Sequence, residues 1–153
     1  MSTQWRIFPV LPKHGHKIIV AILLIGMGLS QVAANVHSMG NITVHYHAFN
    51  SASIPAEVAN AYKIRRGGRT GVVNITVMKN DKPVIANIFG NGKNLAGQLK
   101  ALSFKEIREG AVIYYIATFT FNHSERLTFD LQVQPEREGK LIPITFKQEM
   151  FIN

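Results

Sequence analysis

Strict alternation of apolar and polar residues is the feature that most constrains the fold of this chain. Segment 126–133 places Leu127, Phe129, Leu131 and Val133 on one face and polar side chains on the other. Segment 111–121 alternates in the same way. A period of two puts successive side chains on opposite faces of a strand. The polar segment 122–125 is typical of a turn, so the sequence predicts that the two segments pair as an antiparallel hairpin.

Further segments fit the same template. The sequence predicts strands over 41–49, 71–79, 83–89, 102–109 and 141–152. Residues 80–82 resemble a hairpin connection, and Glu109-Gly110 is expected to form a tight turn into segment 111–121. Pro143 has no amide donor, so its strand is expected at a sheet edge.

These short strands and frequent turns predict an all-β fold. The expected architecture is an immunoglobulin-like antiparallel β-sandwich of about seven strands, with a small closed barrel as the alternative. One short helix is expected at 55–62, because Pro55 suits a helix start. Residues 94–101 carry leucines at helical spacing and remain open between a helical turn and extended chain.

The N-terminal residues 1–34 have the three parts of a secretory signal peptide. Basic residues precede the apolar run 18–29, and small residues follow it up to Ala34. We expect cleavage after Ala34, which leaves residues 35–153 as a single domain. A membrane span needs about 20 apolar residues, whereas the run 18–29 supplies only twelve, so a signal peptide is favoured over the alternative of an uncleaved inner-membrane anchor. The expected location is the bacterial periplasm.

Composition narrows the classes of site and partner. The chain has no cysteine, which excludes disulfides, thiolate metal sites and a cysteine nucleophile. Without the three basic residues of the leader, the net charge falls from +8 to +5. This charge favours anionic surfaces, and export disfavours nucleic acid as a partner. We expect an envelope protein or an anionic envelope component as the partner, and membrane contact only through an uncleaved leader.

Arg65, Arg66 and Arg69 are the best candidates for anion binding. They lie with Gly67 and Gly68 between the expected helix and the strand at 71–79. Guanidinium groups bind phosphate and carboxylate through paired hydrogen bonds. The alternative is a solvated connector in which the glycines let the chain turn.

His45 and His47 form an H-x-H pair on one face of the strand at 41–49. Two imidazoles at this spacing can ligate copper or zinc. A metal site needs one or two further ligands, and His123 is a candidate for one of them. The alternative is that both histidines are ordinary residues on the solvent side of a half-buried strand.

Catalytic motifs are absent from the sequence. There is no G-x-S-x-G, no H-E-x-x-H and no glycine-rich phosphate loop. Ser124, His123 and Asp130 are too close along the chain to face one another as a triad. Neither an enzyme nor a cofactor is therefore expected. Glu106 and Arg108 share a strand face with apolar neighbours, so they are expected to pair at the rim of the core or to be displaced by a bulge.

Six short segments carry a family resemblance. They are residues 45–51, 55–59, 73–77, 94–98, 104–109 and 113–117. Together they resemble the DUF4426 family of exported proteobacterial proteins, which implies an exported domain without an assigned activity. The family pattern has asparagine where this chain has His47, which argues against a shared metal site. His45, Tyr46 and Asn50 match the pattern, which suggests a shared role in ligand contact or in fixing the first strand and the turn after it.

The sequence therefore predicts a non-catalytic periplasmic binding or accessory domain of the cell envelope. The expected contact residues are Arg65, Arg66, Arg69, His45 and Tyr46. The alternative is a small periplasmic metal-binding protein that uses His45 and His47.

Overall fold

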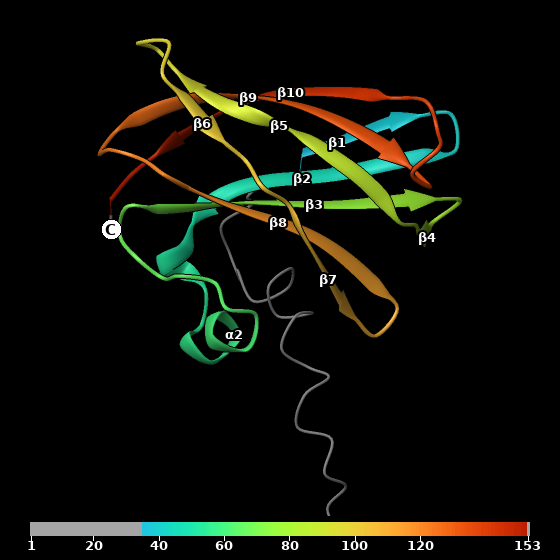
Figure 1. Cartoon of the computed structure of the whole chain (residues 1–153), viewed down its shortest axis with the longest axis horizontal. Coiled ribbons are helices and arrows are strands. Elements are labelled where there is room, and N and C mark those ends of the chain that lie inside the picture. The colour runs from blue at the N-terminus through green and yellow to red at the C-terminus, as the bar shows by residue number, and fades with distance from the viewer. Residues whose placement is uncertain (1–34, 153) are drawn as a thin grey trace, which may run out of the picture.

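Two antiparallel sheets packed face to face form the described part of the chain (Figure 1). The computed structural model describes residues 35–152. The predicted all-β sandwich is confirmed. The predicted signal peptide and its cleavage after Ala34 lie outside the described residues. Among those residues, no helix has the length and apolar character needed to cross a membrane.

The sheets differ in size. Sheet A has the order β1 (Asn35–Met39), β2 (Ile42–Asn50), β3 (Thr70–Lys79), β8 (Val112–Thr120) and β7 (Lys105–Glu109), with β4 (Lys82–Pro83) paired to β3. Sheet B has the order β10 (Ile142–Met150), β9 (Glu125–Pro135), β5 (Ala86–Asn94) and β6 (Leu99–Ala101). A 3-10 turn, η1 (Ser51–Ser53), and the short helix α2 (Ala56–Ala61) join β2 to β3. The expected short helix is therefore confirmed.

The predicted hairpin between segments 111–121 and 126–133 is wrong. Strand β8 pairs with β3 and β7, whereas β9 pairs with β10 and β5. The intervening turn carries the chain from one sheet to the other, and Phe119 meets Phe129 across the core with ring centroids 5.2 Å apart. Alternation shows which face of a strand is apolar, but it does not show whether that face belongs to the same sheet or the opposite one.

The connection at 80–82 is a hairpin over only two residues on each side. Met78 and Lys79 pair with Pro83 and Lys82, and the chain then crosses to sheet B. The predicted strand 83–89 is therefore divided between β4 and β5. Residues 94–101 form a β5–β6 hairpin rather than a helical turn. Strand β1 was not predicted, because its mostly exposed residues do not alternate in polarity.

Two details of the strand prediction are confirmed. The strand containing Pro143 is β10, an edge strand of sheet B. Gly110 has a φ of +58° in the tight turn between β7 and β8, a backbone conformation that glycine adopts without steric cost.

The described residues form a main core, a smaller core and a third, minor cluster of Ile107 and Tyr114. The main core lies between the sheets and is built from the apolar faces of β2, β3, β5, β8, β9 and β10. The smaller core lies on the outer face of sheet A, where η1, α2 and the following loop cover part of β2 and β3. It contains Ile54, Val58, Ala59, Ile64 and Val72. This second core fixes the segment that leads to the arginine loop.

Candidate functional site

The loop of Arg65, Arg66 and Arg69, here called the arginine loop (residues 65–69), is held in place by two buried polar residues. Asn50 Nδ2 donates to the carbonyl oxygens of Gly68 and Phe151, at 3.0 Å each. Ser51 Oγ accepts from the Gly67 amide at 3.0 Å. Because Asn50 and Ser51 are buried, these bonds fix the loop backbone to the end of β2.

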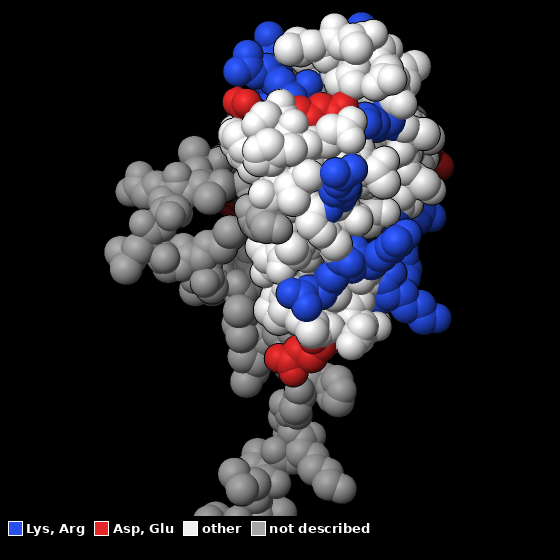
Figure 2. Space-filling model, turned by 90° about the vertical axis from the view of Figure 1, so that its left-hand side faces the viewer, with Lys and Arg blue, Asp and Glu red and all other residues white. Residues whose placement is uncertain are grey.

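The three arginine side chains of the arginine loop are exposed. Arg66 Nη2 donates to the Ala52 carbonyl oxygen at 2.9 Å, which orients this guanidinium. None of the ion pairs among residues 35–152 includes Arg65, Arg66 or Arg69. Figure 2 shows this end of the molecule, where Lys and Arg side chains outnumber acidic ones. The loop therefore presents positive charge that no described acidic side chain neutralises.

His45 and Tyr46 do not join the arginine loop. Tyr46 points into the main core, where its ring lies 4.8 Å from that of Phe146. His45 lies on the opposite face of β2 and stands beside Thr76, in the middle of sheet A. The five predicted contact residues therefore do not form one site. Asn50, which sequence analysis placed in a family-like segment, proves to be the residue that orders the loop.

The H-x-H pair lies on the outer face of β2, as predicted, but His47 is more buried than expected. Its ring stacks on Phe49 with centroids 5.4 Å apart, and its Nδ1 is buried with no hydrogen-bond partner. Burial lowers the pKa of His47. No group of three or more His, Cys, Asp or Glu side chains gathers as a metal site among residues 35–152. His123 Nδ1 accepts from the Ile152 amide at 3.3 Å instead.

A narrow apolar cleft lies between sheet A and the chain on either side of α2. Its lining includes Phe49, Tyr62, Tyr114 and Asn74, whose Oδ1 is buried without a partner. Asn74 stands directly opposite His47 on the neighbouring strand. The cleft has room for about one water molecule, so it does not receive a larger ligand in this conformation. The Tyr62 hydroxyl donates to Glu109 Oε2 at its rim.

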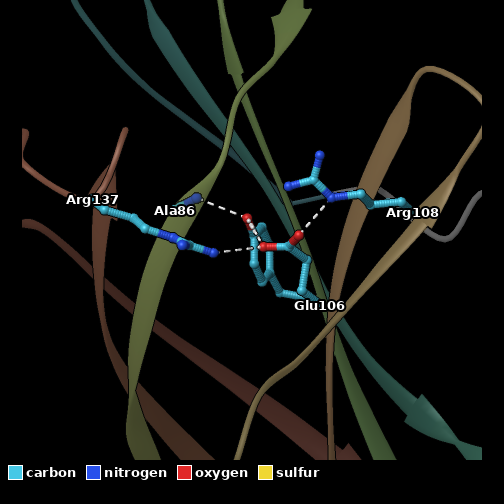
Figure 3. A network of polar contacts seen from close by, with 5 residues as sticks. Ala86, Glu106, Arg108 and Arg137 are labelled. Carbon is cyan, nitrogen blue, oxygen red and sulfur yellow. Dashed lines mark hydrogen bonds and ion pairs between the residues drawn. The ribbon is translucent and has the colours of Figure 1, made fainter.

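Glu106 is the centre of a polar network that joins the two sheets (Figure 3). Arg108 Nε donates to its Oε1 at 2.6 Å, and Arg137 Nη2, from the β9–β10 loop, donates to its Oε2 at 3.1 Å. Tyr115 Oη lies 3.3 Å from the same Oε2 and accepts from the Ala86 amide at 2.7 Å. The hydrogen bond from Arg108 is the main reason that the pKa of Glu106 is lowered. The expected Glu106–Arg108 pair at the core rim is confirmed.

Asp130 and His123, two of the three residues considered for a triad, have structural partners among the described residues. Asp130 Oδ1 accepts from Thr145 Oγ1 at 2.8 Å on the outer face of sheet B. Ser124 lies in the turn before β9 with a φ of +53°. Together with the backbone contact of His123, these positions give the three residues separate surroundings rather than a shared triad geometry.

Comparisons with known proteins give a family but no activity. Residues 36–153 match the model of a family described as a domain of unknown function, DUF4426. A crystal structure of a DUF4426 family protein from Pseudomonas aeruginosa PAO1 is similar at 32% identity and a TM-score of 0.71, over 78% of this chain and 95% of that chain. The likeness extends over almost all of that crystallised chain, so the Pseudomonas aeruginosa protein folds with little chain beyond this domain.

Two other comparisons add no functional information. The GAE domain of yeast GGA1 matches over 76% of this chain and 98% of that chain, but at 8% identity and a TM-score of 0.37 the likeness carries no argument. No curated protein matches the chain.

Proposed function

We propose that the protein is a non-catalytic binding domain of the bacterial cell envelope and that its arginine loop holds an anionic partner. The chain belongs to the DUF4426 family, whose function is unknown, so the proposal is argued from the exposed residues of this chain. The predicted leader supports a periplasmic location. The observation that carries the proposal is an ordered loop whose exposed arginines have no acidic partner among residues 35–152.

The loop is suited to anion binding because its backbone is ordered before any partner arrives. Asn50 and Ser51 fix the turn through buried hydrogen bonds, so less conformational entropy is lost on binding. Guanidinium groups then bind phosphate or carboxylate oxygens through paired donors. A non-catalytic role is supported by Glu106 and His123, whose polar atoms are engaged in contacts that stabilise the fold.

Retention on immobilised heparin, used as a polyanion probe, tests the proposal. The variant Arg65→Ala/Arg69→Ala removes two exposed cations from the arginine loop. The control Lys82→Ala/Lys140→Ala removes two exposed cations from the opposite end of the sandwich, so both variants have the same net charge. We expect the arginine variant to elute at lower salt than the control. Elution of both variants at the same salt would show that only net charge matters and would refute the proposal.

Metal binding through His45 and His47 is the second candidate function. It is favoured by the buried, unpartnered Nδ1 of His47, whose lowered pKa keeps the imidazole neutral at pH 7. It ranks second because no third ligand side chain joins the pair among residues 35–152. Elemental analysis of protein purified from the periplasm tests it: stoichiometric copper or zinc that disappears in His45→Ala would place this function first.

A further inference from the structure

The β5–β6 hairpin carries the two most exposed of the large apolar side chains in residues 35–152. Leu95 is 83% exposed and Leu99 is 66% exposed. The hairpin projects from sheet B beyond the neighbouring strands, at the upper left of Figure 1. No apolar surface of residues 35–152 covers these two leucines, so the tip is a candidate contact surface.

The turn of this hairpin is rigid. Asn94 Oδ1 accepts from the Gln98 amide at 2.9 Å, and Asn94 Nδ2 donates to Gln98 Oε1 at 2.8 Å. The backbone adds hydrogen bonds from Asn94 to Gln98 and from Gly97 to Asn94. Gly97 has a φ of +80°, which favours glycine at this position. The leucines are therefore held in solvent by a well-ordered turn.

A buried carboxylate fixes the base of the hairpin. Glu125, only 8% exposed, accepts from Asn94 Nδ2 and from the Asn122 amide at 2.7 Å each, and it pairs with Lys100 Nζ at 3.3 Å. The residue before Asn122, Phe121, donates its amide to the Arg69 carbonyl oxygen at 3.1 Å. This chain of hydrogen bonds places the hairpin and the arginine loop at the same end of the sandwich.

Cations lie near the leucines on the outer face of sheet B. The strand register aligns Lys147, Thr128, Lys93 and Leu99 in one row across β10, β9, β5 and β6. Arg126 lies one row closer to the tip and pairs with Glu149 at 3.4 Å. An open groove lined by Leu95, Arg126 and Lys147 joins the tip to this row. Exposed leucines flanked by lysine and arginine fit the interface of a bilayer that contains anionic lipids.

We propose that this end of the domain docks on a phospholipid bilayer with anionic headgroups. Leu95 and Leu99 enter the boundary between headgroups and acyl chains, while Lys93 and Lys147 meet lipid phosphates. The arginine loop adds charge at the same end, and in this respect the inference rests on the proposed function. A lipid surface fits better than a protein groove, because a deformable layer admits a convex tip without a preformed pocket. The sequence alone led us to expect membrane contact only through an uncleaved leader.

Sedimentation with vesicles tests this docking surface. Residues 35–153 are used, because the apolar leader would itself bind lipid. Vesicles of phosphatidylglycerol and phosphatidylcholine are compared with vesicles of phosphatidylcholine alone. We expect the domain to bind the anionic vesicles more tightly, and Leu95→Ser/Leu99→Ser to reduce the partition coefficient about tenfold or more. The matched control is Leu141→Ser, which replaces a 48% exposed leucine at the opposite end and leaves the partition coefficient unchanged.

The outcomes separate this inference from the proposed function. Lys93→Ala/Lys147→Ala is expected to weaken binding to anionic vesicles and to reduce its dependence on salt. If wild-type protein does not bind anionic vesicles, or if the serine variant binds as well as wild type, the docking inference is wrong. In either case, elution of Arg65→Ala/Arg69→Ala from heparin at lower salt than Lys82→Ala/Lys140→Ala would still support anion binding by the arginine loop. Because both leucines are exposed, the serine variant should retain the wild-type circular dichroism spectrum and urea midpoint.

Discussion

Asn50 Nδ2 donates a hydrogen bond of 3.0 Å to the carbonyl oxygen of Gly68, across 18 positions of sequence. The same amide group also donates to the Phe151 carbonyl oxygen, and its Oδ1 accepts from the Ala52 amide at 2.8 Å. One buried side chain therefore ties together the end of β2, the arginine loop and the chain after β10.

Replacing Asn50 with Ala should reduce both stability and anion binding. We expect the free energy of unfolding to fall by about 2–4 kcal/mol, because three hydrogen bonds are lost at a buried position. Retention on heparin should fall as well, because the loop is no longer fixed. Urea unfolding measures the first effect. Asn87→Ala is the control, since Asn87 makes one half-buried hydrogen bond to Gln134. An equal loss of unfolding free energy in both variants would contradict the role of Asn50.

Gly71→Ala should disrupt the main core. Gly71 stands opposite Phe119, and a Cβ at position 71 would lie 2.2 Å from Phe119 Cζ. We expect a loss of about 3 kcal/mol, at the upper end of the usual cost of overpacking. Adding Phe119→Leu should recover part of this loss, although Phe119→Leu alone destabilises the protein. A double-mutant cycle with no coupling between the two positions would show that the ring does not occupy this space.

Acid should remove the stabilisation that Glu106 provides. The hydrogen bond from Arg108 is the main cause that lowers its pKa below the ordinary value of 4.5. A carboxyl group whose pKa is lowered by folding stabilises the native state above its unfolded pKa, and this stabilisation is lost as the pH falls through the folded pKa. We therefore expect Glu106→Gln to be less stable than wild type at pH 7 and to approach it at pH 3. Glu138→Gln, at an exposed carboxylate, should show a smaller difference at pH 7.

Tyr62 should ionise only in strongly alkaline solution. Burial and then the hydrogen bond to Glu109 raise its pKa to about 12. Titration of tyrosine absorbance should therefore contain a component near pH 12 that is absent from Tyr62→Phe. Glu109→Gln should move this component to lower pH without returning it fully to 10, because burial remains. A titration that does not change in Tyr62→Phe would contradict the assignment.

The stability contributed by Tyr62 follows from the same shift. Its pKa is raised by folding, so the contribution is complete below the unfolded value of 10 and is lost as the pH rises towards 12. The unfolding free energy of wild type should thus decrease more between pH 10 and pH 12 than that of Tyr62→Phe. A parallel decrease in the two proteins would show that folding does not raise the pKa of Tyr62.

Local pattern was a good guide to strands and a poor guide to their partners. The apolar faces of 111–121 and 126–133 were predicted correctly, since Phe119 and Phe129 are both buried in the main core. Their pairing was wrong because the two strands face each other across the core. For the site, sequence analysis found the arginine loop and associated Asn50 with the first strand, but only the structure shows the contacts of Asn50 with Gly68 and Phe151.

The sequence by itself determined the all-β class, the short helix, the edge position of Pro143 and the basic loop, because each follows from neighbouring residues. Only the tertiary structure decided which strands share a sheet and that the hairpin of Leu95 lies at the same end as Arg69. These relations join residues that are distant in the chain. They depend on how the two sheets bury their apolar faces together, which no local pattern records.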